Sequence, residues 1–188
     1  MLNTTKHKAG RSAAAVLLVV IMAVSVFAQS PRHATDAQRQ VADQLADFKS
    51  KASRLSQEAD ALQSHVRQRL TWQSQSSRLG TIADHVNQMG KSLAELEAMK
   101  PMATDNQQMA IEHSRDHLVA ISEHTTRAIE LIKDNRHNVQ FTEYGDTVND
   151  LQAHAEVLHT KLDTILDFEN ARLRMEALEL QSRRTEGS

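Results

Sequence analysis

Residues 41–66, VADQLADFKSKASRLSQEADALQSHV, carry the pattern that decides the fold. Apolar side chains recur there in steps of four and three residues: Val41, Leu45, Phe48, Ala52, Leu55, Ala59, Leu62 and Val66. A spacing that averages 3.5 residues places them all on one face of an α-helix and is typical of helices that pack along their length. We therefore expect a first helix from Asp36 to about Trp72.

A second segment repeats the pattern. Its apolar positions are Leu79, Ile82, Val86, Met89, Leu93 and Leu96. The segment ends near Lys100, because Pro101 follows. Residues 73–77 are rich in Ser and Gln, whose side chains form hydrogen bonds to the nearby backbone in competition with the helix. This stretch predicts the break between the first and second helices.

Two more helices are predicted after Pro101. Thr104, with Gln107 three residues later, predicts a capping box that opens the third helix. Its inner face is Ile111, Ser114, Leu118, Ile121, Thr125, Ala128 and Ile132. A polar connection follows, and Thr142 or Asp146 is expected to cap the fourth helix. The face of that helix is Tyr144, Val148, Leu151, Ala155, Leu158, Leu162 and Ile165, after which the pattern shifts by one residue at Phe168 and continues through Met175 and Leu178.

These segments predict an all-α protein, an up-down-up-down antiparallel four-helix bundle with heptad seams and long first and fourth helices. The first and fourth helices are expected to overhang a shorter second one. Only five glycines, two prolines and 3% aromatic residues argue against sandwiches, barrels and parallel sheets. The alternative is an extended coiled-coil hairpin or dimer, because one seam per helix can also face a partner chain.

The N-terminal residues have the pattern of a secretory signal peptide. Three cations, Lys6, Lys8 and Arg11, precede an apolar run that ends in Val26-Phe27-Ala28. We expect cleavage after Ala28 and export to the periplasm or the exterior. The alternative is an uncleaved segment that tethers the protein to the membrane. The apolar run, residues 13–28, has sixteen residues, and as a helix it would span only roughly 24 Å of a membrane core of about 30 Å.

The predicted organisation has four parts. Residues 1–28 are the signal peptide and 29–35 a linker, residues 36–182 form the bundle, and 183–188 are a frayed tail. No stretch after the signal peptide is apolar enough to cross a membrane.

Composition narrows the partners and the chemistry. Three of the 22 basic residues lie in residues 1–28, so the mature part carries 19 basic against 24 acidic residues, a formal net charge of −5. An acidic chain with few aromatic residues is not expected to bind nucleic acid. The lack of cysteine excludes disulfides, thiolate metal sites and covalently attached haem. No phosphate loop or nucleophile motif occurs, so we expect no enzyme activity and no resident cofactor.

The histidines are the residues most suited to specific chemistry. His113 and His117 are spaced i, i+4, which lets two imidazoles bind one Zn²⁺, Cu²⁺ or Ni²⁺ from a single helix. Further ligands would come from other helices, and His85 and His154 are the first candidates because they flank apolar faces. His124 shares the same helix face but lies about 10.5 Å along the axis from His117. The alternative is that these are solvated histidines at the edge of the core.

Residues 84–91, DHVNQMGK, with Leu93 and Leu96 after them, resemble a segment in a group of exported bacterial helical proteins of unknown function. The resemblance carries no activity, so it assigns no functional residue. Gly90 lies next to the apolar face, where we expect it to allow the close approach of a neighbouring helix.

The sequence therefore predicts an exported, non-catalytic helical binding or structural protein of the cell envelope. Its partner would be another protein, or a second copy bound through the helical seams. The alternative function is metal binding or metal sensing through His113 and His117.

Overall fold

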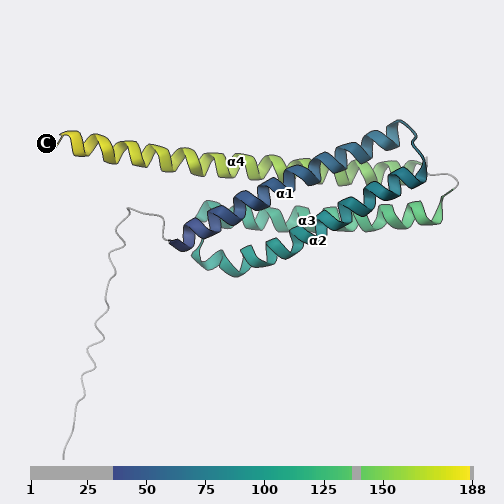
Figure 1. The fold of residues 1–188 in the computed structure, drawn as a ribbon, viewed down its shortest axis with the longest axis horizontal. Helices are drawn as coiled ribbons and strands as arrows, with labels where there is room; N and C mark the ends of the chain where they lie inside the picture. Colours follow the sequence, from purple (N-terminus) through teal and green to yellow (C-terminus); the bar gives the residue numbers. More distant parts are fainter. Residues whose placement is uncertain (1–35, 137–140, 187–188) are drawn as a thin grey trace, which may run out of the picture. The chain divides into compact units, whose positions relative to one another are not determined.

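The computed structural model describes residues 36–136 and 141–186, and the predicted signal peptide and linker lie outside them. Four helices make up this part of the chain: α1 (Asp36–Arg67), α2 (Trp72–Met99), α3 (Asp105–Asp134) and α4 (Thr142–Glu186). A short 3₁₀ helix, η1 (Lys100–Met102), connects α2 to α3. The described residues contain no strand, so the all-α prediction is confirmed (Figure 1).

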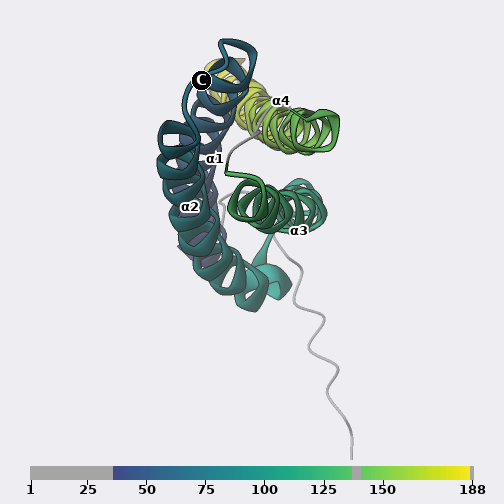
Figure 2. The ribbon, with the colours of Figure 1, turned by 90° about the vertical axis from the view of Figure 1, so that its right-hand side faces the viewer.

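The four helices pack against one another around a single apolar core. Each of them has two main neighbours: α1 contacts α2 and α4, and α3 contacts α2 and α4. Figure 2 shows α1 and α2 side by side on one side of the bundle and α3 and α4 on the other. The predicted inner positions up to Ile165 are buried, except that Val66 and Ile165 are half-buried. The predicted continuation of the pattern at Phe168, Met175 and Leu178 is exposed instead. Each buried Leu, Ile, Val or Phe side chain stabilises the fold by about 1.5–3 kcal/mol.

The predicted break between the first two helices is wrong. The chain turns over residues 68–71, where Arg69 has a φ of 57°, and residues 73–77 form the first turns of α2. Thr71 accepts a hydrogen bond from the backbone N of Ser74, and the Gln75 side chain donates one to the Leu70 carbonyl oxygen at 2.7 Å. Thr71 therefore caps the start of α2, where such residues are favoured, and the Ser/Gln-rich stretch lies inside the helix.

The relative helix lengths also differ from the prediction. The helices α1, α2 and α3 have 32, 28 and 30 residues, so α1 does not overhang α2 as expected. Only α4 is long, at 45 residues, and it continues past the predicted boundary at residue 182 to Glu186. The capping box at the start of α3 is confirmed, because Thr104 and Gln107 exchange both of its hydrogen bonds.

The C-terminal part of α4 runs beyond the other helices. In Figure 1 it is the yellow part of the ribbon. Among its described side chains, none after Glu169 is buried. None of the helices in the described part of the chain has an apolar stretch long enough to span a bilayer.

Candidate functional site

Two of the predicted site histidines meet where α3 packs on α4. The Nδ1 atoms of His117 on α3 and His154 on α4 lie 3.2 Å apart. Both side chains are half-buried at the edge of the core. One ring nitrogen must carry a proton and the other accept it for this contact to be a hydrogen bond, so at least one of the two imidazoles is neutral in that state.

His154 also contacts His124, which brings together two positions separated by two turns of α3. The ring centroids of His124 and His154 are 5.5 Å apart and the rings are stacked at 24°, whereas His117 and His154 are tilted at 51° with the same centroid separation. We call His117, His124 and His154 the histidine cluster. Spacing along α3 alone places His117 and His124 far apart, and it cannot show that one histidine of α4 lies between them.

The other two candidate ligands stand apart from the contacts of this cluster. Within the described residues, no hydrogen bond or ring contact joins His113 or His85 to it, and no group of three or more His, Asp or Glu side chains is placed to hold a metal ion. Among these four candidate ligands, the contact seen in the described part of the chain bridges two helices and joins His117 to His154.

The surroundings of His117 favour its neutral form. Burial lowers its pKa below the ordinary value of 6.5, and the nearby His154, Lys161 and His113 lower it further, while Asp116 acts in the opposite direction. A neutral imidazole has a lone pair free to accept a proton or to bind a metal ion.

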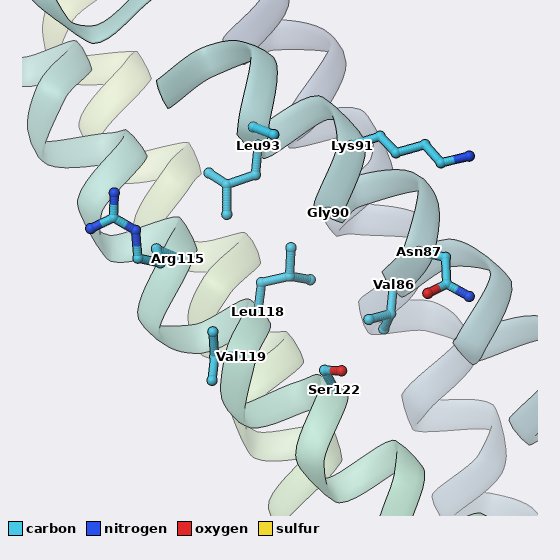
Figure 3. Close-up of a pocket in the computed structure, with 10 residues that line it drawn as sticks. Val86, Asn87, Gly90, Lys91, Leu93, Arg115, Leu118, Val119 and Ser122 are labelled. Carbon is cyan, nitrogen blue, oxygen red and sulfur yellow. The ribbon is translucent and has the colours of Figure 1, made fainter. Parts of the chain in front are cut away.

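A second feature is an apolar groove of about 500 Å³ between α2 and α3. Val86 and Leu93 of α2 and Leu118 and Val119 of α3 form its walls. Figure 3 shows Leu93 and Leu118 in the space between the two helices. The volume lies within the range of about 300–1,000 Å³ that small-ligand sites occupy.

The rim of this groove is polar and partly cationic. Asn87 and Ser122 add hydrogen-bonding groups, and Lys91 and Arg115 add positive charge. The side chains of Lys91 and Arg115 point outward in Figure 3. Arg115 also donates a hydrogen bond from Nε to Glu97 at 2.6 Å.

Gly90 leaves one side of the groove open. The expected close approach of a neighbouring helix is not found, because a Cβ atom built at Gly90 meets no heavy atom of the described residues within 4 Å. Glycine inside a helix costs about 0.5–1 kcal/mol relative to alanine. Packing does not require glycine at this position, since a larger residue would fit. The missing side chain leaves the groove accessible.

Sequence reasoning missed a buried carboxylate at the N-terminal end of α3. Glu169 of α4 is 5% exposed and accepts hydrogen bonds from Thr104, Asn106 and Arg172. Burial alone would raise its pKa, but these bonds and the charge of Arg172 outweigh burial and hold the pKa below its usual value. Glu169 occupies the position where the apolar face of α4 would continue after Ile165. That position in the heptad pattern is the only feature of the sequence that could have indicated its burial.

Comparisons with known proteins add no family to these observations. The chain matches no protein-family model, no curated protein and no solved structure.

Proposed function

We propose that the mature chain is an exported, non-catalytic helical binding protein of the cell envelope, and that the groove between α2 and α3 is its binding site. The observation that carries this proposal is an apolar groove whose volume suits a ligand, beside a glycine that no packing contact explains. Export rests on the signal-peptide pattern of residues 1–28.

The groove suits the apolar part of a partner or ligand that also carries a negative charge. Its walls are aliphatic, so covering them with the apolar surface of a ligand removes both surfaces from water and favours binding. Lys91 at the rim would attract an anionic group at the edge of such a ligand, whereas the charge of Arg115 is balanced by Glu97.

We also propose that the helices run alternately up and down and meet along heptad seams. The connections over residues 68–71, 100–104 and 135–141 are short, and short connections favour antiparallel neighbours. The buried positions of α1 keep alternating steps of four and three from Val41 to Leu62, which is the spacing of such seams.

A fluorescent anion tests the groove. The probe is 1-anilinonaphthalene-8-sulfonate, which has an apolar aromatic body and one sulfonate and fluoresces strongly when it leaves water. The variant Gly90→Leu would place a side chain in the groove, and the space around Gly90 allows it. The matched control is Gly80→Leu, because Gly80 lies on the same helix, has equally open surroundings and does not line the groove.

We expect the unmodified protein and Gly80→Leu to enhance the fluorescence of the dye equally. Gly90→Leu should weaken the binding about tenfold, which corresponds to the loss of about 1.4 kcal/mol of contact. Equal binding by all three proteins, or no enhancement by any of them, would mean that the groove is not a binding site.

The second candidate function is metal binding, and the contact between His117 and His154 favours it. Two nitrogens on a tetrahedral metal with bonds of about 2.0–2.1 Å lie about 3.3 Å apart, close to the observed 3.2 Å. Two imidazoles leave coordination positions for water, so we expect a weak site for Zn²⁺, Cu²⁺ or Ni²⁺ rather than a closed structural zinc site.

Calorimetry with Zn²⁺, Ni²⁺ and Cu²⁺ tests this candidate. The informative variants are His117→Gln and His154→Gln, and His113→Gln is the control because His113 makes no contact with His154 in the described structure. Loss of binding in both informative variants, with the control unchanged, would support the metal site. Equal binding in all the variants would refute it, and loss in His113→Gln alongside His117→Gln would restore the pair on one helix.

A further inference from the structure

Four apolar positions follow one another along the part of α4 that leaves the bundle. They are Phe168, Ala171, Met175 and Leu178, in steps of three, four and three residues, and we call them the C-terminal seam. The large side chains among them are strongly exposed: Phe168 is 62%, Met175 63% and Leu178 65% accessible. Large apolar side chains gathered on one exposed helix face are typical of an interaction surface.

The C-terminal seam lies on a different face of α4 from the one that enters the bundle. Continuing the buried positions past Ile165 in steps of four and three leads to Glu169, Arg172 and Glu176. These three side chains pair with one another, because Arg172 bonds to Glu169 at 3.0 Å and to Glu176 at 2.7 Å. The inner face of α4 therefore becomes charged where the bundle ends. The C-terminal seam is rotated around the helix axis from that face.

We propose that the C-terminal seam binds the same seam of a second copy of this chain, forming a parallel two-stranded coiled coil. Residues 168–186 carry four acidic and four basic side chains, so two copies do not repel each other through net charge. Steps of three and four residues are the spacing that such a pair of helices requires.

Charges beside the seam indicate a parallel, in-register pair. Arg174 comes directly before Met175, and Glu179 comes directly after Leu178. In a parallel coiled coil, residues in these two flanking positions, five apart in sequence, face each other across the helices. Arg174 of each copy then lies opposite Glu179 of the other. In an antiparallel pair Arg174 would instead lie near Gln181, which has no charge.

The contact is short, which sets the expected affinity. From Phe168 to Leu178 it spans about one and a half heptads. It lies at the small end of specific interfaces, so we expect a dissociation constant in the micromolar range. This association does not involve the groove between α2 and α3, so the two proposals stand or fall separately.

Sedimentation equilibrium of the mature protein between about 1 and 100 μM measures the association. We expect a reversible dimer that Met175→Glu weakens more than tenfold. Leu173→Glu is the matched control, because Leu173 is 41% exposed on the opposite face of the same extension. A monomer over the whole range, or equal weakening by both variants, would overturn the proposal.

Charge reversal tests the pairing of Arg174 with Glu179. Arg174→Glu should weaken the dimer by placing two glutamates opposite each other, and adding Glu179→Arg to the same chain should restore it. Failure of the double variant to recover would overturn the parallel arrangement. All of these side chains are exposed, so the helix content of each variant should equal that of the unmodified protein.

The absence of cysteine permits a direct measurement of orientation. Ala171→Cys should form an intermolecular disulfide under mild oxidation, since the two copies of residue 171 are adjacent in a parallel pair. In the antiparallel register that pairs Met175 with Leu178, they would be about 16 Å apart and would not react. Ala177→Cys, on the opposite face, should stay unlinked. Equal linking of both variants, or no linking of Ala171→Cys, would overturn the proposal.

Discussion

Replacing Glu169 with Gln tests how the end of α3 is joined to α4. Gln has nearly the same shape as Glu, so the substitution removes the negative charge while preserving the packing. The carboxylate accepts hydrogen bonds from Asn106 at 2.6 Å, from Arg172 at 3.0 Å and from the Thr104 hydroxyl at 3.2 Å. Thr104 caps α3, so the charge also lies near the positive end of that helix.

The strength of these hydrogen bonds sets the size of the loss. A hydrogen bond to a charged group contributes about 1.5–3 kcal/mol and one between neutral groups about 0.5–1.5 kcal/mol. The two shortest bonds would thus lose about 2 kcal/mol together. Relief from burying a charge offsets part of this, so we expect Glu169→Gln to lower the free energy of unfolding by about 1–2 kcal/mol at pH 7.

Urea unfolding followed by circular dichroism, at pH 7 and in steps down to about pH 3, follows the free energy of unfolding as the carboxylate becomes protonated. Because folding lowers the pKa of Glu169, its carboxylate stabilises the fold above the ordinary value of 4.5, and this contribution is lost as the pH falls through the folded pKa. The difference between parent and variant should therefore shrink in acid. Glu176→Gln is the control, because Glu176 is exposed and its pair with Arg172 should contribute under about 1 kcal/mol. Equal stability of parent and Glu169→Gln at pH 7, or a difference that persists unchanged in acid, would refute the reasoning.

Three further predictions concern the core and the N-terminus. Leu55→Ala should lower the unfolding free energy measured in urea by about 2–5 kcal/mol because Leu55 is fully buried, with Leu118→Ala at the lower end beside the groove; changes below about 0.5 kcal/mol at both positions would contradict the core assignment. Tyr144→Phe should raise the melting temperature, because the Tyr144 hydroxyl is buried with no hydrogen-bond partner among the described residues and its removal relieves a cost of about 1 kcal/mol; a lower melting temperature would show that the hydroxyl has a partner. N-terminal sequencing of exported protein should begin at Gln29, and recovery of the full-length chain in membranes would support the anchor instead.

Spacing along the chain predicted the helices and their inner faces well. The period of apolar residues is set by the geometry of one helix, so Val41, Leu45 and Phe48 identify a buried face without any knowledge of its neighbours. The capping box at Thr104 is equally local, since its two hydrogen bonds join residues three apart.

Features that depend on two helices could not be predicted in this way. The contact of His154 with His117 and His124 depends on how α4 is positioned along α3, which no local pattern records. The groove beside Gly90 depends on what the facing helix leaves unfilled. The break between α1 and α2 was misplaced for another reason. Side chains that bond to the nearby backbone, as Gln75 does to Leu70, occur in the first turn of a helix as well as in a break, and composition alone does not separate the two.

The order in which the helices pack has a consequence for how fast the chain folds. Three of the four main interfaces join helices that are consecutive in the chain, and only α1 with α4 joins distant segments. That interface includes the ion pair of Lys49 with Asp163 and the hydrogen bond of Gln63 with Asn149. The loop-closure entropy cost therefore falls mainly on one step, the docking of α4 onto α1. The other interfaces form between helices that are consecutive in the chain and cost less. If that docking follows the transition state, substitutions between α1 and α4 will accelerate unfolding and leave the folding rate almost unchanged.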